Sequence, residues 1–301
     1  MKPVILDVDT GIDDALAIRY ALNSPELKVV GITTCYGNVP VPLASRNSLA
    51  IIESVGGHVP VYQGASQPLV RKAKYAPIVH GEDGLGNQLN FTPKGKISNI
   101  SAVEILIKTI RENPHEITVI AVGPLTNIAI AVNLAPEIVD LVKEVIIMGG
   151  AVRVPGNVTP YGEANIVSDP EAAQIVFQSG LPISLVGLDV TMQTLLPINV
   201  LDTWRKSGKD TTLLVNMTEH YMKAYDHFYP GIGGCALHDP LAVAVAIDPS
   251  FVKKEAMDIE VVLEGEKVGQ TNGNPNPYST VQVCIDVKAN EFLEHFLSRI
   301  L

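Results

Sequence analysis

The chain has 301 residues, of which 47% are hydrophobic and 18% are charged, and its formal net charge is −10. This composition argues against disorder and predicts a well-buried core in one large domain or two smaller ones. The negative charge disfavours nucleic acid and anionic membranes as partners, and no apolar run reaches the length of a membrane span, which leaves a small neutral substrate as an option.

Short β-branched runs alternate with helical patterns along most of the chain. The predicted strands are residues 4–9, 29–35, 59–62, 117–122, 145–148 and 183–189, and the predicted helices are residues 14–22, 43–55, 102–112, 125–133, 170–179, 211–227 and 240–247. This alternation predicts an α/β fold with an open, mostly parallel, Rossmann-like sheet and helices on both faces. Alternating Val and Ile between Gly and Asn turns in residues 261–287 predict a small C-terminal β extension. We expect a single domain over residues 1–301.

The cysteines and the N-terminus indicate a compartment. Cys35, Cys235 and Cys284 are widely spaced and odd in number, so they form neither a disulfide framework nor a zinc-site pattern. The first predicted strand begins almost at once, without a basic and then apolar leader. We therefore expect a cytoplasmic protein.

The first predicted strand leads into an acidic segment, Asp7-Val8-Asp9-Thr10-Gly11-Ile12-Asp13-Asp14. Because side chains alternate along a strand, we expect Asp7 and Asp9 to point to the same side. Asp13 and Asp14 fall at the start of the next helix, where a carboxylate caps free N–H groups. Capping does not account for four acids, because carboxylates this close cannot all stay ionised without a cation. Oxygen ligands of this kind indicate calcium or magnesium.

Two other acidic loops are alternatives for this segment. An EF-hand loop needs Glu at its twelfth position, but Ile18 or Tyr20 stands there when the count starts at Asp7 or Asp9. A haloacid-dehalogenase-like phosphatase also has Asp-x-Asp after a first strand, and Asp7 would be its nucleophile. That alternative also needs a lysine for the phosphate and a further acidic pair, and neither is placed convincingly in the sequence.

Ligands of open parallel sheets bind beyond the carboxyl ends of the strands. Polar or glycine-rich segments follow five predicted strands, at residues 7–9, 36–38, 123–127, 148–150 and 187–191, and we expect them to converge on one crevice. The long loop at residues 149–169 adds Gly162-Glu163-Ala164-Asn165, with Asn157 before it. These side chains are typical of turns, but they also suit the hydroxyl groups of a sugar.

Two further segments carry candidate residues. His238-Asp239-Pro240 precedes a predicted helix, where Asp239 can be a cap, a metal ligand or both, and His238 can transfer a proton. Residues 80–86, which begin with His80, read as a flexible loop or a surface turn. Aromatic side chains recur with helical spacing between Tyr221 and Tyr229. This stripe is either core or part of a lid over a ring-shaped ligand.

In combination, these segments resemble the nucleoside hydrolases, and more narrowly the branch that prefers inosine and uridine. The resemblance depends on the segments Asp7–Asp14, Gly123–Asn127, Met148–Gly150, Glu163–Asn165 and His238–Pro240, and it extends to at least Asp248. It implies an N-ribohydrolase that acts on small ribonucleosides, holds a tightly bound Ca²⁺ and forms a homodimer or homotetramer.

The resemblance also implies roles for single residues. It implies calcium binding by Asp9, Asp14, Asp239 and the main-chain oxygen of Val122, activation of the attacking water by Asp9, and a catalytic His238 near the base. The substrate-binding residues that it implies are Asp13, Asn38, His80, Met148, Asn157, Glu163 and Asn165, to which we add Tyr225 and Tyr229 from the aromatic stripe.

The expected chemistry agrees with these residues. Breaking an N-glycosidic bond builds positive charge on the ribose, and a pocket rich in carboxylates stabilises that charge. The sequence leaves a non-catalytic nucleoside-binding protein and the phosphatase as alternatives. The base preference is open among uridine, cytidine and inosine. Residues 73–90 and 221–238 contain no Trp, which disfavours a site built on tryptophan stacking.

Overall fold

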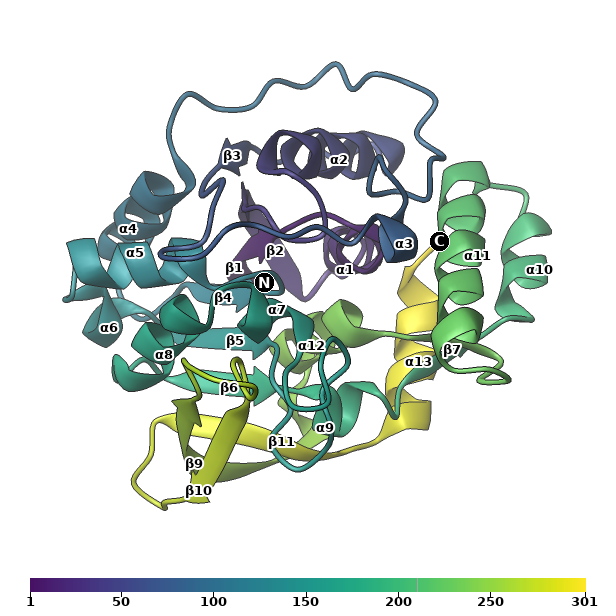
Figure 1. The fold of residues 1–301 in the computed structure, drawn as a ribbon. Coiled ribbons are helices and arrows are strands. Elements are labelled where there is room, and N and C mark those ends of the chain that lie inside the picture. The colour runs from purple at the N-terminus through teal and green to yellow at the C-terminus, as the bar shows by residue number, and fades with distance from the viewer. Residues whose placement is uncertain (210) are drawn as a thin grey trace.

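A nine-stranded sheet forms the centre of the molecule (Figure 1). The computed structural model describes residues 1–209 and 211–301. The strand order is β10-β9-β11-β6-β5-β4-β1-β2-β3. The strands are β1 (Lys2–Val8), β2 (Leu27–Thr34), β3 (Val61–Gln63), β4 (Thr118–Ala121), β5 (Glu144–Met148), β6 (Ile183–Val186), β9 (Val252–Val261), β10 (Thr271–Pro275) and β11 (Val281–Val287). The run from β3 to β11 is parallel, and β9 pairs antiparallel with β10 and β11.

The centre of the sheet lies at β1, which pairs with β2 on one side and β4 on the other. Asp7 is in register with Thr33 of β2 and with Ala121 of β4. The chain crosses over in opposite directions from β1, so the sheet has its topological switch point here. In open α/β sheets this point opens a crevice beyond the carboxyl ends of the strands.

Helices cover both faces of the sheet, as the sequence predicted. One face carries α1 (Ile12–Leu22), α2 (Val41–Ser54), α12 (His238–Ile247) and α13 (Ala289–Arg299), and the other carries α4 (Ala102–Glu112), α5 (Thr126–Leu134), α6 (Ile138–Leu141) and α8 (Pro170–Gln178). The alternation of side chains in β1 divides the core accordingly. Val4, Leu6 and Val8 belong to the first cluster, whereas Ile5 belongs to the second.

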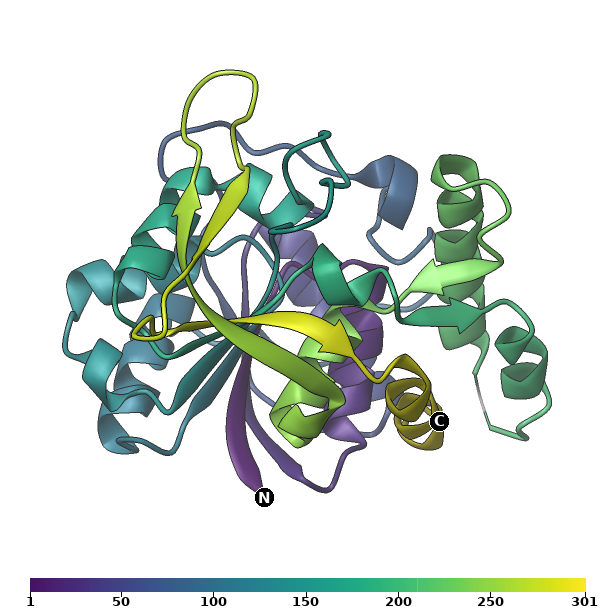
Figure 2. The same cartoon turned by 90° about the horizontal axis from the view of Figure 1, so that it is seen from below.

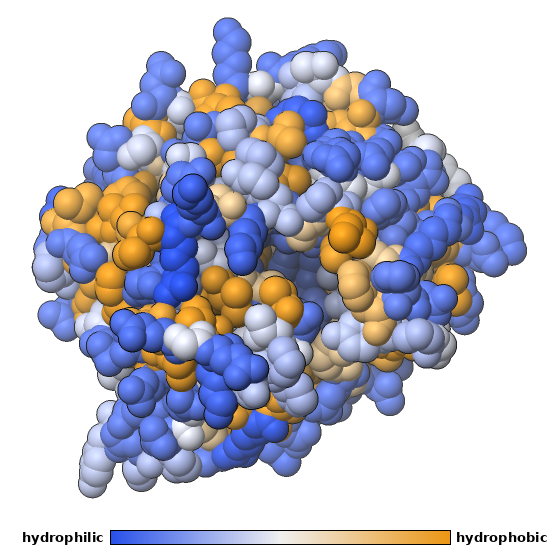
Figure 3. Space-filling model, in the orientation of Figure 1, coloured by the Kyte–Doolittle hydropathy of each residue, from blue (hydrophilic) through white to orange (hydrophobic). Residues whose placement is uncertain are grey.

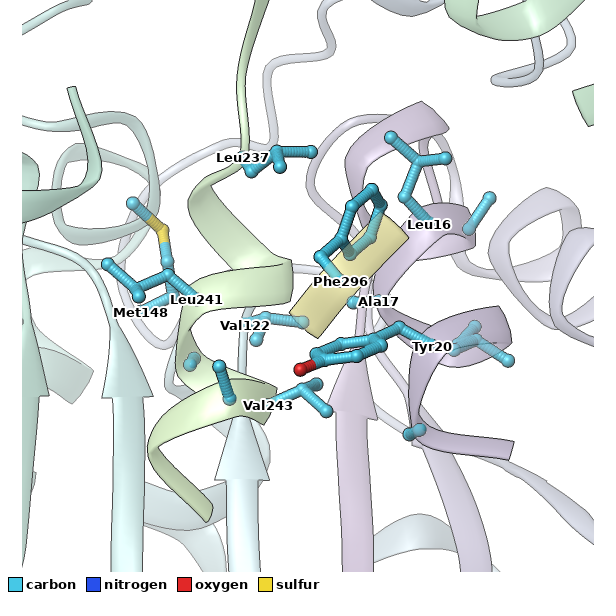
Figure 4. Close-up of a cluster of buried hydrophobic side chains, with 14 of the residues drawn as sticks. Leu16, Ala17, Tyr20, Val122, Met148, Leu237, Leu241, Val243 and Phe296 are labelled. Carbon is cyan, nitrogen blue, oxygen red and sulfur yellow. The ribbon is translucent and has the colours of Figure 1, made fainter. Parts of the chain in front are cut away.

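The helices α1 and α12 pack against each other over the ends of the central strands. Figure 4 shows Leu16 and Ala17 of α1 on one side of a buried cluster and Leu241 of α12 on the other, with Val122, which follows β4, between them. All four side chains are almost completely buried. Full burial of one leucine-sized side chain contributes about 1.5–3 kcal/mol, so this contact holds the first turns of both helices beside the crevice.

The chain contains several further elements. They are the helices α3 (Pro77–His80), α7 (Ala164–Ser168), α9 (Leu188–Thr191), α10 (Val200–Arg205) and α11 (Thr212–Phe228), a 3-10 turn at Pro249–Phe251, and the two-stranded sheet of β7 (Leu195–Pro197) and β8 (Gly234–Ala236). Figure 2 shows α10, α11 and the β7–β8 pair grouped at one side of the molecule. Among the described residues, no helix combines the length and apolar character that a membrane crossing requires.

The structure corrects three expectations about the elements. The predicted strand 183–189 ends at Val186, because the Asp189 carboxylate turns to accept hydrogen bonds from the N–H groups of Val152 and Arg153, and residues 188–191 form α9. The long loops that the sequence predicts at residues 63–96, 149–169 and 229–238 contain the short elements α3, α7 and β8, respectively. The C-terminal β extension begins earlier than predicted, at Val252, and it joins the main sheet through β11.

Candidate active site

Asp14 closes the first turn of α1 with its carboxylate. Its Oδ1 accepts from the N–H of Asp9 at 3.0 Å, and its Oδ2 accepts from the N–H of Gly11 at 3.0 Å and from Asn38 Nδ2 at 3.1 Å. Gly11 cannot be replaced without displacement, because a Cβ there would lie 2.6 Å from His80 Nδ1. Asp14 therefore caps the helix, as the sequence predicted, and ties β1 to the segment after β2.

Asp9 follows β1 and lies between the ends of the neighbouring strands. Its Oδ2 accepts from the N–H of Asn38 at 2.6 Å. A Cβ on Gly37 would lie 2.0 Å from this Oδ2, and a Cβ on Gly123 would lie 2.9 Å from Oδ1. The glycines after β2 and β4 are therefore required for the fit around Asp9. The sequence analysis missed this requirement, since it links residues that are far apart in the chain.

Asp13 joins the first turns of α1 and α12. Its Oδ2 accepts from the N–H of Asp239 at 3.1 Å. The helix α12 begins at His238, with Leu237 in the cap position, and Asp239 lies inside its first turn. The interpretation of Asp239 as the helix cap is therefore wrong. Its carboxylate is free of that role.

These four carboxylates are buried together. Asp9, Asp13, Asp14 and Asp239 are at most 4% exposed. Burial raises the pKa of each, and repulsion by neighbouring carboxylates raises the pKa of Asp9, Asp13 and Asp239 further. The Oδ1 atoms of Asp9 and Asp13 are buried without a hydrogen-bond partner. Within residues 1–209 and 211–301, no lysine or arginine forms an ion pair with any of the four.

The carboxylates do not form a ready set of metal ligands. In the described part of the chain, no three His, Cys, Asp or Glu side chains are arranged so that they would hold a metal ion. The main-chain oxygen of Val122 accepts from Asn165 Nδ2 at 2.8 Å. The calcium site therefore stays a prediction, supported by the unpartnered oxygens, because a buried anion needs either a donor or a cation.

The loop after β5 contributes Glu163, the cap of α7. Its Oε1 accepts from the N–H of Asn165, and its Oε2 accepts from the N–H groups of Gly150 and Ile166, at 2.9–3.2 Å. Burial raises the pKa of Glu163. Asn157 holds the same turn, because its Oδ1 accepts from the N–H of Ala164 at 3.1 Å. These bonds fix one carboxylate and two amides at the crevice.

A cavity of about 560 Å³ opens above these groups. Figure 3 shows it as a hollow near the centre of this face, with hydrophobic residues along one side. It is lined by every predicted substrate-binding residue, namely Asp13, Asn38, His80, Met148, Asn157, Glu163, Asn165, Tyr225 and Tyr229, and by Val122, His238 and Asp239. Asp9 and Asp14 do not line the cavity themselves. Both accept hydrogen bonds from Asn38, which does line it.

The opposite wall of the cavity is aromatic and comes from α3 and α11. The rings of His80 and Tyr221 stack with centroids 5.5 Å apart, and the centroids of Tyr221 and Tyr225 are 4.9 Å apart. His80 Nδ1 accepts from the N–H of Ile12 at 3.1 Å. The aromatic stripe thus lines the cavity along its whole length, since buried Tyr221 and Tyr225 and the more exposed Tyr229 all belong to the lining.

His238 connects the two walls. Its Nε2 lies 2.5 Å from the Tyr225 hydroxyl, and its Nδ1 lies 2.6 Å from Thr191 Oγ1. Burial lowers the pKa of His238 to about 4. The sequence predicts residues 187–191 at the crevice but indicates no role for Thr191. The apolar rim of the cavity adds Tyr75, Ile78 and Val158, which the sequence did not single out, and Phe228, which belongs to the predicted aromatic stripe.

Asp7 lies outside the cavity. It is fully buried, its Oδ1 accepts from Thr33 Oγ1 at 2.5 Å and from Asn127 Nδ2 at 2.8 Å, and burial raises its pKa to about 6. A phosphatase nucleophile must reach its substrate, so this position argues against the phosphatase alternative.

Comparisons with known proteins agree with this geometry. The family model described as inosine-uridine preferring nucleoside hydrolase matches residues 4–294. The chain is 45% identical to the probable uridine nucleosidase 2 of Arabidopsis thaliana, over 83% of this chain and 79% of that protein. It is 39% identical to the inosine-uridine preferring nucleoside hydrolase of Leishmania major, over 88% of this chain and 84% of that protein.

A solved structure extends the agreement to the whole fold. The purine-preferring ribonucleoside hydrolase from Gardnerella vaginalis superposes with a TM-score of 0.96 and is 42% identical, covering 99% of this chain and 98% of that one. The match spans both walls of the cavity and all nine strands of the sheet. The chain therefore belongs to the inosine–uridine-preferring nucleoside hydrolase family and is a nucleoside N-ribohydrolase.

Proposed function

We propose that this enzyme hydrolyses both pyrimidine and purine ribonucleosides to ribose and free base in a calcium-dependent reaction. One observation carries the proposal. A cavity large enough for a nucleoside has buried carboxylates and amides at its foot and a wall of aromatic rings opposite. Such a foot suits a ribose that gains positive charge, and such a wall suits a flat base.

The oxygen atoms beneath the cavity are of the kind that a hard divalent cation binds, although their side chains are not arranged as a complete ligand set. Asp9, Asp14, Asp239 and the main-chain oxygen of Val122 would hold Ca²⁺, since buried carboxylate and carbonyl oxygens are the ligands that this ion prefers. Asp9 keeps one oxygen free of hydrogen bonds, and Asp14 Oδ1, which accepts one hydrogen bond, has a second lone pair. Bound Ca²⁺ would orient the ribose hydroxyls and a water molecule and lower the pKa of that water.

In the proposed reaction Asp9 acts as the general base. The oxygen of the attacking water bonds to C1′ of the ribose, one water proton goes to Asp9, and the bond from C1′ to the base breaks with its electron pair on the base. Burial and repulsion by Asp14 raise the pKa of Asp9, so its ionised form is a stronger proton acceptor than an exposed aspartate. Asp13, Asn157, Glu163 and Asn165 would bind the ribose hydroxyls.

The leaving base takes up a proton from the pair of Tyr225 and His238. The hydrogen bond between Tyr225 and His238 Nε2 puts both groups at the junction of the polar foot and the aromatic wall. Solvent restores this proton and removes the one held by Asp9, so the net reaction consumes one water molecule. Each of these roles needs contact with substrate, which the cavity lining permits for Tyr225 and His238.

The aromatic wall supports activity on both classes of base. His80, Tyr221, Tyr225 and Tyr229 present ring faces and edges, which stack on any base without reading its pattern of donors and acceptors. The names of the relatives above include uridine nucleosidases and a purine-preferring hydrolase. The homodimeric or homotetrameric state and the cytoplasmic location stay predictions.

The experiment that tests this proposal measures ribose release from uridine, cytidine and inosine with and without Ca²⁺. Asp9→Asn keeps the shape of the side chain, so we expect a folded protein whose kcat falls by about two orders of magnitude or more. Turnover within a few-fold of the wild type would contradict the role of Asp9. Phosphate release from p-nitrophenyl phosphate, or tight binding of intact nucleoside without cleavage, would instead support the phosphatase or the binding protein.

A further inference from the structure

Both ring nitrogens of His238 have a partner. The Tyr225 hydroxyl lies 2.5 Å from Nε2, and Thr191 Oγ1 lies 2.6 Å from Nδ1. The three residues are 8%, 6% and 0% exposed, in the order Tyr225, His238 and Thr191. They form a buried row that begins at the cavity wall and ends in the core.

Thr191 cannot touch a bound nucleoside. It is the last residue of α9, is completely buried and is not part of the cavity lining. Its backbone is fixed beside His238, because the N–H of Leu237 donates to the carbonyl of Thr194 at 2.9 Å and β7 pairs with β8 directly beyond. Any effect of the Thr191 hydroxyl on catalysis must therefore pass through the imidazole of His238.

We propose that Thr191 is a positioning residue for protonation of the leaving base. Its hydroxyl holds the His238 ring so that Nε2 meets Tyr225 at the cavity wall. This inference rests on the proposed function, in which Tyr225 and His238 supply the proton. The proton moves from that pair to the base nitrogen that keeps the electron pair of the broken bond, and Thr191 neither gains nor loses one.

The chemistry of a hydroxyl group suits this task. A threonine hydroxyl donates or accepts, so it stays bonded to Nδ1 whichever ring nitrogen carries the proton. Without that bond the imidazole is free to turn about its outer torsion, which has broad minima, and a buried ring nitrogen is left without a partner. A partner on the core side therefore fixes the orientation of the ring without occupying the cavity.

The test compares two variants on two kinds of substrate. Thr191→Val has the same shape without the hydroxyl, and Thr191→Ser keeps the hydroxyl. Uridine and inosine need a proton on the leaving base, whereas p-nitrophenyl β-D-ribofuranoside releases a stable phenolate that needs none. We expect Thr191→Val to lower kcat for uridine and inosine by about 10-fold to 100-fold, with KM changed less than about threefold, while the nitrophenyl substrate is hydrolysed at nearly the wild-type rate. Thr191→Ser should restore most of the activity on nucleosides.

Thr194→Val is the matched control, because Thr194 is buried in the same turn and its hydroxyl donates to the backbone of Thr191 instead of to His238. Thr194→Val should change kcat by the same factor on the nucleosides and on the nitrophenyl substrate. Thr191→Ala provides a second hydroxyl-free variant if Thr191→Val does not fold, and thermal unfolding midpoints establish which variants are folded.

The possible results are distinguishable. Equal losses on nucleosides and on the nitrophenyl substrate would overturn the positioning role, and so would a folded Thr191→Val with wild-type kcat on uridine and inosine. If the wild-type enzyme releases ribose from none of these substrates, the proposed function and the inference fail together. If the wild-type enzyme does release ribose, a negative result contradicts the positioning role of Thr191 and leaves the proposed function intact.

Discussion

His80 shows how one residue joins the start of a helix to the cavity wall. Its Nδ1 accepts from the N–H of Ile12 in α1, and its ring stacks on Tyr221 of α11. Gly11 leaves the space that the ring occupies. Because Nδ1 accepts a hydrogen bond, the neutral ring carries its proton on Nε2. Protonation of Nδ1 would break the contact with α1.

We expect His80 to make the stability of the fold depend on pH. Burial, together with the nearby His220 and His238, lowers the pKa of His80 from its ordinary value of 6.5 to about 3. Between these values the folded state binds fewer protons than the unfolded state, so the free energy of unfolding falls as the pH drops from 6.5 towards 3. The titration of His80 changes the free energy of unfolding by at most about 5 kcal/mol. Urea unfolding of the wild type and of His80→Gln between pH 4 and pH 7 measures it.

The comparison of the two proteins isolates His80 from the other titrating groups. The stability of the wild type relative to His80→Gln should be largest at pH 7 and should decrease towards pH 4. His58→Gln, at an exposed histidine, should change stability little at any pH. A difference between the wild type and His80→Gln that stays constant across this range would contradict the assignment.

At the scale of whole elements, the sequence predicted most of the long helices and strands, but the predicted elements did not include α13 or β9. The helix α4 begins and ends where the 3.6-residue pattern does, at Ala102 and Glu112, because its apolar side faces the sheet and a capping box at Ser101 starts it. The short elements α3 and α9 escaped prediction. Four residues carry too little pattern, and such helices depend on contacts with distant segments.

The same distinction applies to the site. The rule that strand ends converge predicted the crevice, since it depends on topology alone, whereas the residues expected to line it came from the family resemblance and the aromatic stripe. It did not predict the row from Thr191 to Tyr225 or the fit of Gly37 against Asp9. Those contacts depend on the distances between side chains of different elements, and these distances cannot be read from the sequence.

The packing of α1 on α12 should determine the distance between Asp13 and Asp239. Ala17 of α1 is 1% exposed and belongs to the core cluster that α1 shares with α12 (Figure 4). We expect Ala17→Leu to push the helices apart, to cost about 1–3 kcal/mol of stability and to reduce kcat/KM at least tenfold, because the bond from the Asp239 N–H to Asp13 would lengthen. Denaturant unfolding and nucleoside kinetics measure the two effects.

Ala173→Leu is the control for this prediction. Ala173 of α8 is completely buried in the core cluster on the other face of the sheet, away from the first turns of α1 and α12. It should lose similar stability while the folded enzyme keeps its kcat/KM. If both variants lose the same fraction of activity, the contact between α1 and α12 has no special link to the site.

For the molecule as a whole, the fold concentrates negative charge at one point of an acidic protein. The switch point of the sheet brings Asp9 to the end of β1, and the two helices that start there add Asp13, Asp14 and Asp239. Burying them together raises their pKa values, which is a cost to folding at neutral pH. A bound cation would offset that cost only in the folded state, because the unfolded chain does not hold these residues together.

Calcium should therefore stabilise the entire fold. A ligand that binds only the folded state, at 100 times its dissociation constant, adds about 2.7 kcal/mol, which for a chain of this size raises the thermal midpoint by about 4 °C. We expect this rise when Ca²⁺ replaces EDTA, and a much smaller one in Asp239→Asn.

Asp169→Asn is the matched control, since the oxygens of this buried carboxylate accept from Leu69, Thr126 and Ala172 outside the cavity. Asp169→Asn should lower the midpoint and keep the calcium-dependent rise. A midpoint that does not respond to Ca²⁺ in the wild type would mean that the buried acids are neutralised by protons, and catalysis would then have to proceed without the ion.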